Sequence, residues 1–346
     1  MEGVGMKVLL TGADGYIGVR MGDYLLQRGH QVVGLDSGFH RVGWLYNSTD
    51  RRPETMTKDT RDVTIDDLRG FDALVHLAEV SNDPVGELNS DVTFKINHEG
   101  SLRLATLAKQ AGIERFVHMS SCSVYGATGE QPSREGDPTE PLTSYAKCKV
   151  LVENDVAPLA DDSFSPTFMR NATAYGASPR QRFDLVVNDL SASAFLYNEI
   201  RMASDGTPWR PFVHVLDISH AAACILEAPR EVIHNEIFNV GSDDQNHQVR
   251  QIAEIIGALV PGCSLSFGDS SADKRNYRAD FTKIHEQLPG FRCAWSVERG
   301  VKDLLDIFRT IGLDEELYRF RGHTRIKQIK HLIGTNQVDD DLVWNI

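Results

Sequence analysis

The chain has 346 residues, 41% of them hydrophobic, which is enough for one large or two modest domains with a substantial core. Its 36 basic and 49 acidic residues give a formal net charge of −13, which argues against nucleic acid as a partner because nucleic-acid-binding surfaces are usually basic. No apolar run approaches the roughly 20 residues of a membrane span, and the five cysteines form no CxxC pair, so we expect no membrane partner, no disulfide framework and no metal.

The first predicted element is a buried strand at 7–12, KVLLTG, which is followed by an amphipathic helix at 19–29. The strand begins so close to the start of the sequence that no signal peptide fits before it. Together with the scattered cysteines, this predicts a protein of the reducing cytoplasm.

The turn between these two elements contains three glycines, Gly12, Gly15 and Gly18, in the sequence TGADGYIG. Their spacing is GxxGxxG rather than the GxGxxG of the usual dinucleotide-binding turn. Gly12 permits a tight turn, Gly15 allows the backbone to approach a pyrophosphate, and Gly18 lets the helix pack closely on the strand. Because a helix N-terminus also stabilises negative charge, this first strand–helix turn indicates a dinucleotide site.

The second predicted strand, 31–36, ends at Asp36, about 20 residues after the glycine turn. A carboxylate at this point accepts hydrogen bonds from both ribose hydroxyls and repels a 2′-phosphate. Asp36 therefore predicts NAD rather than NADP, although the nearby Arg41 is a cation that would suit NADP.

Short apolar runs and helix-length segments continue to alternate along the chain. This alternation predicts a parallel sheet with helices on both faces. The further strands are expected at 73–78, 115–121, 164–172 and 236–242, and the further helices at 91–111, 144–160, 249–260 and 297–311.

Two residues of the predicted helix at 144–160, Tyr145 and Lys149, are four positions apart and therefore share one helix face. Free tyrosine has a pKa of about 10 and is a weak base at neutral pH. A neighbouring ammonium favours the phenolate, so this pair suits the proton transfer that accompanies hydride transfer to a nicotinamide. Small hydroxyl residues end the strand at 115–121, at the edge of the sheet where ligands of such folds bind.

Taken together, these motifs resemble the extended short-chain dehydrogenase/reductase superfamily, in particular its nucleotide-sugar epimerases and dehydratases, the UDP-glucose 4-epimerase-like family. The resemblance covers nearly the whole chain. It implies a Rossmann-type, doubly wound parallel sheet with a smaller α/β substrate-binding lobe at its C-terminal side. The resemblance places the NAD-binding domain at 1–172 with roughly 210–242, the substrate lobe at 173–209 and 243–314, and a C-terminal extension at 315–346.

The resemblance also assigns residues to catalysis and to the cofactor. Tyr145 would be the base, Lys149 its partner, and Ser121, the hydroxyl residue four positions before the tyrosine of VYG, would hydrogen-bond the reacting oxygen. The segments TRDVTIDDL, HLAE and INHEGS match further cofactor motifs of the family. The residues implied for cofactor binding are Gly12, Gly15, Tyr16, Ile17, Gly18, Asp36, Asp62, Leu77, Ala78, Asn97, Tyr145 and Lys149.

The two residues after Ser121 bear on the type of reaction. In the 4,6-dehydratase branch of the family, an Asp-Glu pair at these positions eliminates water, whereas this chain has Cys122 and Ser123. Neither side chain readily replaces a carboxylate, so dehydration by the usual mechanism is disfavoured. Thiols act as acid/base groups in some related epimerases, but those thiols align with Ser123. Adjacent strand residues point to opposite sides, so we interpret Cys122 as a buried packing residue.

The family match also implies residues that contact a nucleotide-diphosphate sugar. Arg210 in WRPFVHVLD would bind the diphosphate, for which a guanidinium fork is well shaped. The family's second diphosphate arginine is a serine here, and Arg275 or Arg278 would serve instead. The sequence identifies neither the base nor the sugar. The implied substrate-binding residues are Ser121, Cys122, Ser123, Asn171, Asn188, Arg210, Arg275 and Arg278.

The extension at 315–346 continues beyond the usual end of the family. Three interpretations are open: it covers a partner subunit, it covers the substrate lobe, or it is an appendage without a fixed position. The helices at 91–111 and 144–160 correspond to those that form a four-helix dimer interface in the superfamily, and we therefore expect a homodimer.

The favoured hypothesis is an NAD-dependent nucleotide-sugar epimerase that acts at C4 through a transient 4-keto sugar, with Tyr145 as the base. A second hypothesis is a nucleotide-sugar 4,6-dehydratase or 4-ketoreductase of deoxysugar biosynthesis. A third, of another class, is a catalytically silent protein that senses NAD. The intact set of Ser121, Tyr145 and Lys149 argues against the third hypothesis, because a sensor needs none of these residues.

Overall fold

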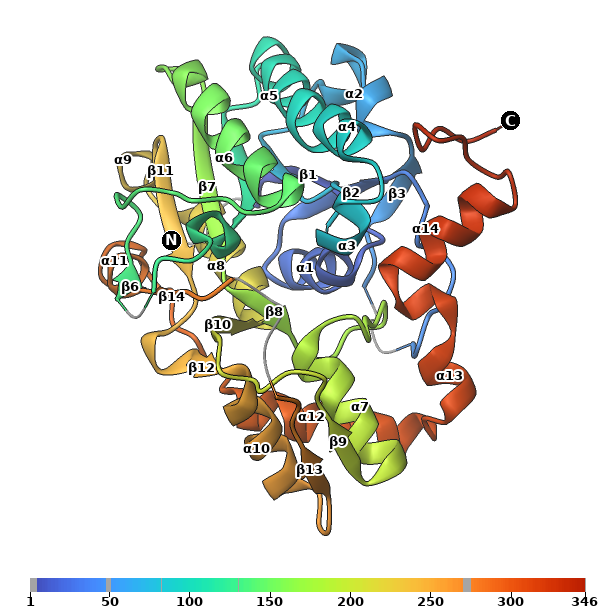
Figure 1. The fold of residues 1–346 in the computed structure, drawn as a ribbon. Helices are drawn as coiled ribbons and strands as arrows, with labels where there is room; N and C mark the ends of the chain where they lie inside the picture. Colours follow the sequence, from blue (N-terminus) through green and yellow to red (C-terminus); the bar gives the residue numbers. More distant parts are fainter. Residues whose placement is uncertain (1–4, 48–50, 82, 130, 270–274, 346) are drawn as a thin grey trace.

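The computed structural model describes residues 5–47, 51–81, 83–129, 131–269 and 275–345. Figure 1 shows a central sheet with helices on both faces, a lobe beside it, and a C-terminal segment that runs from the lobe back along the sheet layer. Within the described residues, no helix is long and apolar enough to cross a membrane.

Seven parallel strands form the central sheet, in the order β11-β7-β5-β4-β1-β2-β3. The chain starts in the middle, moves to one edge and then returns to build the other edge, which confirms the doubly wound fold predicted from the sequence. The strands are β1 (Lys7–Thr11), β2 (Gln31–Asp36), β3 (Glu54–Thr57), β4 (Ala73–His76), β5 (Arg115–Ser121), β7 (Ser165–Asn171) and β11 (Glu236–Val240).

Two helix pairs cover the sheet, and they are α1 (Tyr16–Gln27) with α8 (Val215–Glu227), and α5 (Gly100–Gln110) with α6 (Ser144–Val156). Both faces are apolar because alternate residues of each strand point to opposite sides. In β1, Val8 and Leu10 pack with Met21 of α1, whereas Leu9 packs with Leu104 of α5 and Val152 of α6. The near-continuous apolar strands of the sequence are therefore those of a sheet buried on both sides.

The segment between β4 and β5 is helical for most of its length. The sequence predicts one helix over 91–111, and the structure has α3 (Asp83–Gly86), α4 (Ser90–Thr93), a π-helical stretch (Phe94–Glu99) and then α5. Stretches of π-helix inside α-helices are rare and often lie at functional sites. The short helix α2 (Ile65–Leu68) and strand β3 were not predicted, because their sequences are short and polar.

A second apolar core defines the smaller lobe. Helices α7, α10 and α12 contribute Val187, Ile252 and Val301 to it, and β10 contributes Phe212. The elements of the lobe are β8 (Thr173–Tyr175), α7 (Val186–Tyr197), β9 (Glu199–Arg201), β10 (Trp209–His214), β12 (Asn246–Gln248), α10 (Val249–Leu259), β13 (Ser264–Ser266) and α12 (Val297–Ile311), and the remaining short elements are β6 (Pro132–Ser133), α9 (Arg230–Ile233), β14 (Arg278–Ala279) and α11 (Thr282–Gln287).

The C-terminal extension is packed onto the rest of the chain at both of its helices, α13 (Glu315–Arg319) and α14 (Arg325–Gly334). In α13, the Tyr318 hydroxyl donates to the Asp189 carboxylate of α7 at 2.6 Å. The apolar side of α14 packs on the α3–α4 region beside the central sheet (Figure 1). The extension therefore crosses from the lobe to the sheet of its own chain.

Candidate active site

The glycine turn after β1 has the backbone geometry that the sequence predicts. Gly12 has a φ of +72°, and a Cβ there would lie 3.0 Å from the backbone nitrogen of Ala78. A Cβ on Gly18 would lie 2.0 Å from the Gly12 carbonyl oxygen. Both positions need glycine, because any side chain would force α1 away from the strand ends.

The turn borders a cavity of about 980 Å³, including its open mouth. This cavity lies at the carboxyl ends of the central strands, where doubly wound sheets bind their ligands. Eight of the cofactor residues predicted from the sequence line it, and they are Gly12, Gly15, Tyr16, Ile17, Gly18, Asp36, Leu77 and Ala78. We therefore identify this cavity as the cofactor groove.

Asp36, at the end of β2, turns its carboxylate toward the groove. One oxygen accepts a hydrogen bond from the Gly38 backbone at 2.7 Å and the other from the Asp14 backbone at 3.1 Å. Burial raises the pKa of Asp36, and these backbone donors oppose that effect. Arg41, which would suit NADP, donates instead to Asp14 at 2.8 Å and to Thr57 at 2.6 Å.

Four predicted cofactor residues are not among those that line the groove, and they are Asp62, Asn97, Tyr145 and Lys149. Asp62 is not among the lining residues, whereas Asp59, one turn earlier, is. Asn97, in the π-helical stretch, is fully buried and uses its amide to bond both the N–H (2.8 Å) and the C=O (2.9 Å) of Val80, which does line the groove. Asn97 thus fixes the backbone of Val80 in the lining of the groove without lining the groove itself.

Other lining residues were not among the cofactor residues predicted from the sequence. Glu79 ends the HLAE segment, Arg182 follows the 178–181 turn, and Arg325 and Leu342 come from the C-terminal extension. The first two lie next to recognised motifs, and a search for charged residues beside those motifs would have found them. The further lining residues are Ser37, Phe39, His40, Asp59, Thr60, Val80, Ser81, Val85, Ile96 and Ile329.

Tyr145 and Lys149 lie on α6 as predicted, beside the end of β5. The Lys149 ammonium is 5.3 Å from the centre of the Tyr145 ring, donates to the Met119 carbonyl, and is 2.5 Å from a Glu79 carboxylate oxygen. Burial disfavours the charged form of Lys149, but the negative charge of Glu79 outweighs this and raises the pKa of Lys149.

The same three groups set the acidity of the tyrosine. Burial raises the pKa of Tyr145 above its usual value, Lys149 lowers it, and the Glu79 carboxylate raises it again. Glu79 is the acidic residue of HLAE and its side chain is 2% exposed. A buried carboxylate therefore offsets part of the effect that Lys149 has on Tyr145.

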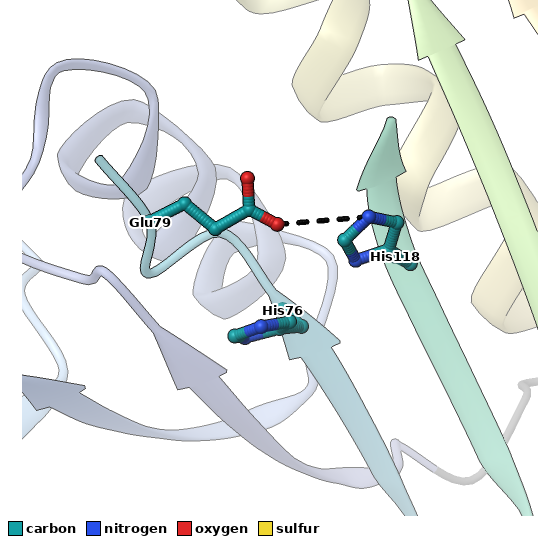
Figure 2. Close-up of side chains that lie close together, drawn as sticks. All are labelled: His76, Glu79 and His118. Carbon is teal, nitrogen blue, oxygen red and sulfur yellow. Dashed lines mark ion pairs between the residues drawn. The ribbon is translucent and has the colours of Figure 1, made fainter. Parts of the chain in front are cut away.

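Glu79 also lies close to two histidines, as Figure 2 shows. The strand register places Thr11, His76 and His118 side by side, and ligand atoms of His76, Glu79 and His118 lie within 4.8 Å of one another. Both nitrogens of His76 are already bonded, to Thr11 at 2.7 Å and to Ser101 at 2.8 Å. Because the Lys149 ammonium also contacts Glu79, the cluster does not offer three free ligands to a metal ion.

Burial keeps both histidines of this cluster neutral. It lowers the pKa of His76 to about 3 and lowers the pKa of His118 well below its usual value. His118 is fully buried, and its nearest acidic atom is the Glu79 carboxylate oxygen at 3.6 Å. The cluster thus places two uncharged imidazoles, tilted relative to each other, next to the Lys149–Glu79 ion pair.

The segment after β5 separates its hydroxyl from its thiol. The Ser121 hydroxyl accepts a hydrogen bond from the Ser123 backbone at 3.1 Å and caps the short helical turn that follows. Cys122 is fully buried, its thiol donates to the Arg170 carbonyl at 3.1 Å, and burial raises its pKa. The Ser123 hydroxyl is buried and has no hydrogen-bond partner among the described residues.

The two predicted asparagines have different surroundings. Asn171 pairs with Ser121 across the neighbouring strands β5 and β7, and its side-chain oxygen is buried without a partner among the described residues. Asn188 of α7 is fully buried and accepts from the Gly176 backbone at 2.9 Å. Its amide nitrogen donates to the Tyr16 hydroxyl at 3.2 Å and to the Arg182 carbonyl at 3.1 Å. Asn188 therefore connects α7 to the cofactor groove.

The three predicted diphosphate arginines gather in one region. The Arg210 guanidinium donates to the Arg275 carbonyl and lies 5.3 Å from the centre of the Tyr277 ring. The Arg278 guanidinium lies 3.6 Å from the centre of the Trp209 ring. The Arg275 side chain forms an ion pair with Asp83, at the start of α3.

Comparisons with known proteins relate this chain to one family. Residues 8–241 match the model of the NAD dependent epimerase/dehydratase family. The UDP-glucose 4-epimerase of Yersinia pestis is 28% identical over 335 residues, covering 86% of this chain and 95% of that protein. That of Mycolicibacterium smegmatis is 29% identical over 322 residues, covering 88% and 99%. The structure of MoeE5 in complex with UDP-glucose and NAD superposes with a TM-score of 0.75 and 25% identity, covering 88% of this chain and 99% of that one.

Proposed function

The chain belongs to the NAD-dependent epimerase/dehydratase family, and we propose that it is an epimerase that inverts C4 of a nucleotide-diphosphate sugar through a transient 4-keto sugar. The observation that carries this proposal is the contact of β5 with α6, since β5 ends at Ser121, α6 carries the Tyr145–Lys149 pair, and no carboxylate pair follows Ser121. UDP-hexoses are the first substrates to test, because the UDP-glucose 4-epimerases named above align with nearly the whole chain.

The glycine turn and the hydrogen-bonding groups that line the groove suit NAD. Gly12 and Gly18 allow the tight turn and the close packing of α1, Gly15 would let the backbone come close to the pyrophosphate, and the Asp36 carboxylate would accept from the ribose hydroxyls. When bound, NAD supplies the chemistry of accepting a hydride from the sugar and returning it to the opposite face.

The residues of α6 and β5 manage the proton at the sugar oxygen. Tyr145 takes this proton as hydride leaves and gives it back when hydride returns. An ammonium has three N–H donors, and Lys149 donates to the Met119 carbonyl and forms an ion pair with Glu79. A remaining N–H of Lys149 would hold the nicotinamide ribose of bound NAD. Ser121 hydrogen-bonds the same sugar oxygen and stabilises the charge that develops there.

Epimerisation is favoured over dehydration by the two residues after Ser121. Elimination of water needs an acid and a base at the next carbons of the sugar. Cys122 is buried against the Arg170 carbonyl and its pKa is raised by burial, and Ser123 carries an unactivated hydroxyl.

We propose that the sugar diphosphate lies near Arg210 and Arg275, with Arg278 against Trp209 beside them.

We also propose that the active form is a homodimer in the cytoplasm, joined through α5 and α6. These helices correspond to the dimer helices of the superfamily, and the exposed Leu142 lies just before α6. Light scattering at micromolar concentration checks this assembly. A monomeric protein at that concentration contradicts it.

The experiment that tests the reaction combines cofactor and product analysis. The purified protein is incubated with UDP-, GDP-, CDP- and dTDP-hexoses, and the sugars are analysed by NMR. A C4-inverted sugar formed without net consumption of cofactor supports an epimerase. A 4-keto-6-deoxy sugar would identify a dehydratase, and a requirement for added NADPH would identify a ketoreductase. A protein that retains NAD and converts none of these sugars would fit the sensor hypothesis.

A further inference from the structure

The C-terminal extension forms one wall of the cofactor groove. Arg325 and Ile329 of α14 and Leu342 beyond it line the same cavity as the glycine turn. These residues lie outside the 8–241 segment that matches the family model. This wall is therefore a feature of this chain that the family match does not assign.

Polar contacts fasten the extension on two sides of the groove. On the β2 side, the Trp344 indole donates to the Ser37 carbonyl at 2.7 Å, and Gln328 donates to the Phe39 carbonyl at 3.1 Å. On the other side, the Arg61 guanidinium donates to the carbonyls of residues 341 and 342 at 2.8 and 2.9 Å. The segment is thus hydrogen-bonded both to the chain after β2 and to the chain after β3.

The same segment also packs into an apolar cluster. Side chains of α14 and the tail pack with the region between α3 and the π-helical stretch. The buried members of this cluster are Val85, Val92, Ile96, Ile329, Leu332, Val338 and Leu342. Because these contacts are made along the segment that follows Arg325, from Ile326 to Trp344, the groove wall has a defined position without a ligand.

Two buried guanidinium groups line the groove, Arg325 in this wall and Arg182 in the segment before α7. Each has N–H groups without a hydrogen-bond partner among the described residues. Arg325 is 5% exposed, and its guanidinium makes no hydrogen bond or ion pair with any described residue. Arg182 is 6% exposed and bonds Asp184 through Nε at 2.8 Å, but its Nη2 is buried with no partner in the described part of the chain. Arg325 is a buried cation without an ion-pair partner among the described residues, which is costly, and Arg182 keeps an unpaired N–H group although it forms an ion pair with Asp184. A bound anion is therefore expected to complete both groups.

The charges that face these arginines leave a positive surplus. Burial, together with the neighbouring Arg182 and Arg180, lowers the pKa of Arg325 to about 9, against the opposing effect of Asp184 and Asp36. His40 is neutral because burial lowers its pKa well below the usual value. Three arginines thus face two carboxylates, and one of these carboxylates, Asp36, is at the ribose position.

The position of Arg182 points to the start of α1. Its carbonyl and the Tyr16 hydroxyl accept from the same Asn188 amide. Tyr16 is the first residue of α1, where the backbone N–H groups of this fold meet a pyrophosphate. The pyrophosphate is the negatively charged group of NAD, and guanidinium groups bind it well.

We propose that Arg325 and Arg182 bind the pyrophosphate of NAD, and that the segment 325–344 thereby retains the cofactor in its groove. The C-terminal extension is then a part of the cofactor site. The proposal concerns binding alone, so its test does not depend on which sugar the enzyme converts.

The test compares two charge-removing variants of α14 in the full-length protein, Arg325→Gln and Lys330→Gln. Lys330 is exposed on the same helix, so its variant controls for the change in net charge. The first readout is the molar ratio of NAD to protein after gel filtration. The second is the affinity for ADP, adenosine and 2′-AMP after bound nucleotide has been dialysed away. We expect Arg325→Gln to lose NAD and to bind ADP about tenfold more weakly or worse, with adenosine little changed.

Each alternative has a distinct outcome. Equal loss of ADP and adenosine would show that the variant only collapses the pocket, and a loss confined to 2′-AMP would place the arginine at a ribose phosphate; both results overturn the proposal. Unchanged ADP affinity overturns it as well. If Arg325→Gln does not fold, Arg325→Lys keeps the charge but not the fork, and it should weaken ADP binding less than the loss of charge would, yet measurably. Wild-type ADP affinity in that variant contradicts the proposal.

Discussion

The cofactor groove has two regions of buried charge, and they are built in opposite ways. Beside Tyr145, the Lys149 ammonium is paired at 2.5 Å with Glu79, the member of this group that lines the groove, so the charges balance without a ligand. At the wall formed by the extension, Arg325 and the neighbouring Arg182 and Arg180 exceed the two carboxylates, Asp184 and Asp36, that face them. The first region is organised before anything binds, which suits catalysis. The second is completed only by an anion, which suits retention of a cofactor.

The sharpest way to break this comparison is to remove the base from the balanced region. Tyr145→Phe deletes only the ionisable oxygen, and we expect the rate of hydride transfer to fall by about a hundredfold or more. The NAD content should stay at the wild-type level, because the cofactor is held elsewhere. Single-turnover reduction of bound NAD, followed by absorbance, measures the rate. A variant with near-normal rates would remove Tyr145 from the mechanism.

Ser121→Ala should have the next largest effect. It removes one hydrogen bond to the charge that develops on the sugar oxygen, and a loss of about tenfold is expected in the same single-turnover assay. Because Ser121 also caps the turn after β5, the thermal unfolding midpoint serves as the control for folding. An unchanged rate in a folded variant would assign Ser121 to the turn alone.

Glu79→Gln sharpens the comparison, because it removes the carboxylate that balances Lys149. Glu79 raises the pKa of Tyr145 and Lys149 lowers it, so the variant should have a lower tyrosine pKa. The phenolate is the active base, and activity therefore rises with pH through this pKa. The rising limb of the kcat profile should move to lower pH in Glu79→Gln and stay in place in the exposed control Glu99→Gln. A limb that moves to higher pH would show that Glu79 acts by orienting Lys149.

The smallest effect is expected from Cys122→Ser. The thiol is fully buried against the Arg170 carbonyl, and burial raises its pKa, so it takes no part in proton transfer at neutral pH. The variant should retain most of the wild-type turnover in product analysis. An inactive enzyme with normal NAD content would revive acid/base chemistry at C3 or C5 of the sugar.

The predictions that the structure confirms are those that rest on residues close together in the sequence. The strands at 31–36 and 115–121 and the helix at 297–311 have the predicted bounds. Gly12 and Asp36 lie at the groove as expected. The helix predicted at 19–29 begins earlier, at Tyr16, because Gly15 already takes the N-cap position. Local patterns worked here because alternation, helical periodicity and turn chemistry act over a few residues.

The same reasoning placed the extension beyond the family end but left its position open. Sequence periodicity gives no information on which distant surface a helix will meet. Arg325 lines the same cavity as Arg182, which is far from it in the sequence. Trp344 donates a hydrogen bond to Ser37, which is more than 300 positions away in the chain. Similarly, only the tertiary structure shows that Asn97, predicted as a cofactor residue, bonds the groove segment at Val80, and that Asn188, predicted as a substrate residue, bonds Tyr16.

The sequence by itself thus determined the doubly wound sheet, the dinucleotide turn, the preference for NAD over NADP as a prediction, and the tyrosine–lysine pair. These follow from short-range sterics and hydrogen bonding, which a few neighbouring residues specify. Only the tertiary structure decided that Glu79 offsets Lys149 and that α14 closes the cofactor groove with Arg325. Both depend on the electrostatics and packing of groups brought together by the fold, and burial gives such contacts a strength that sequence separation does not reveal.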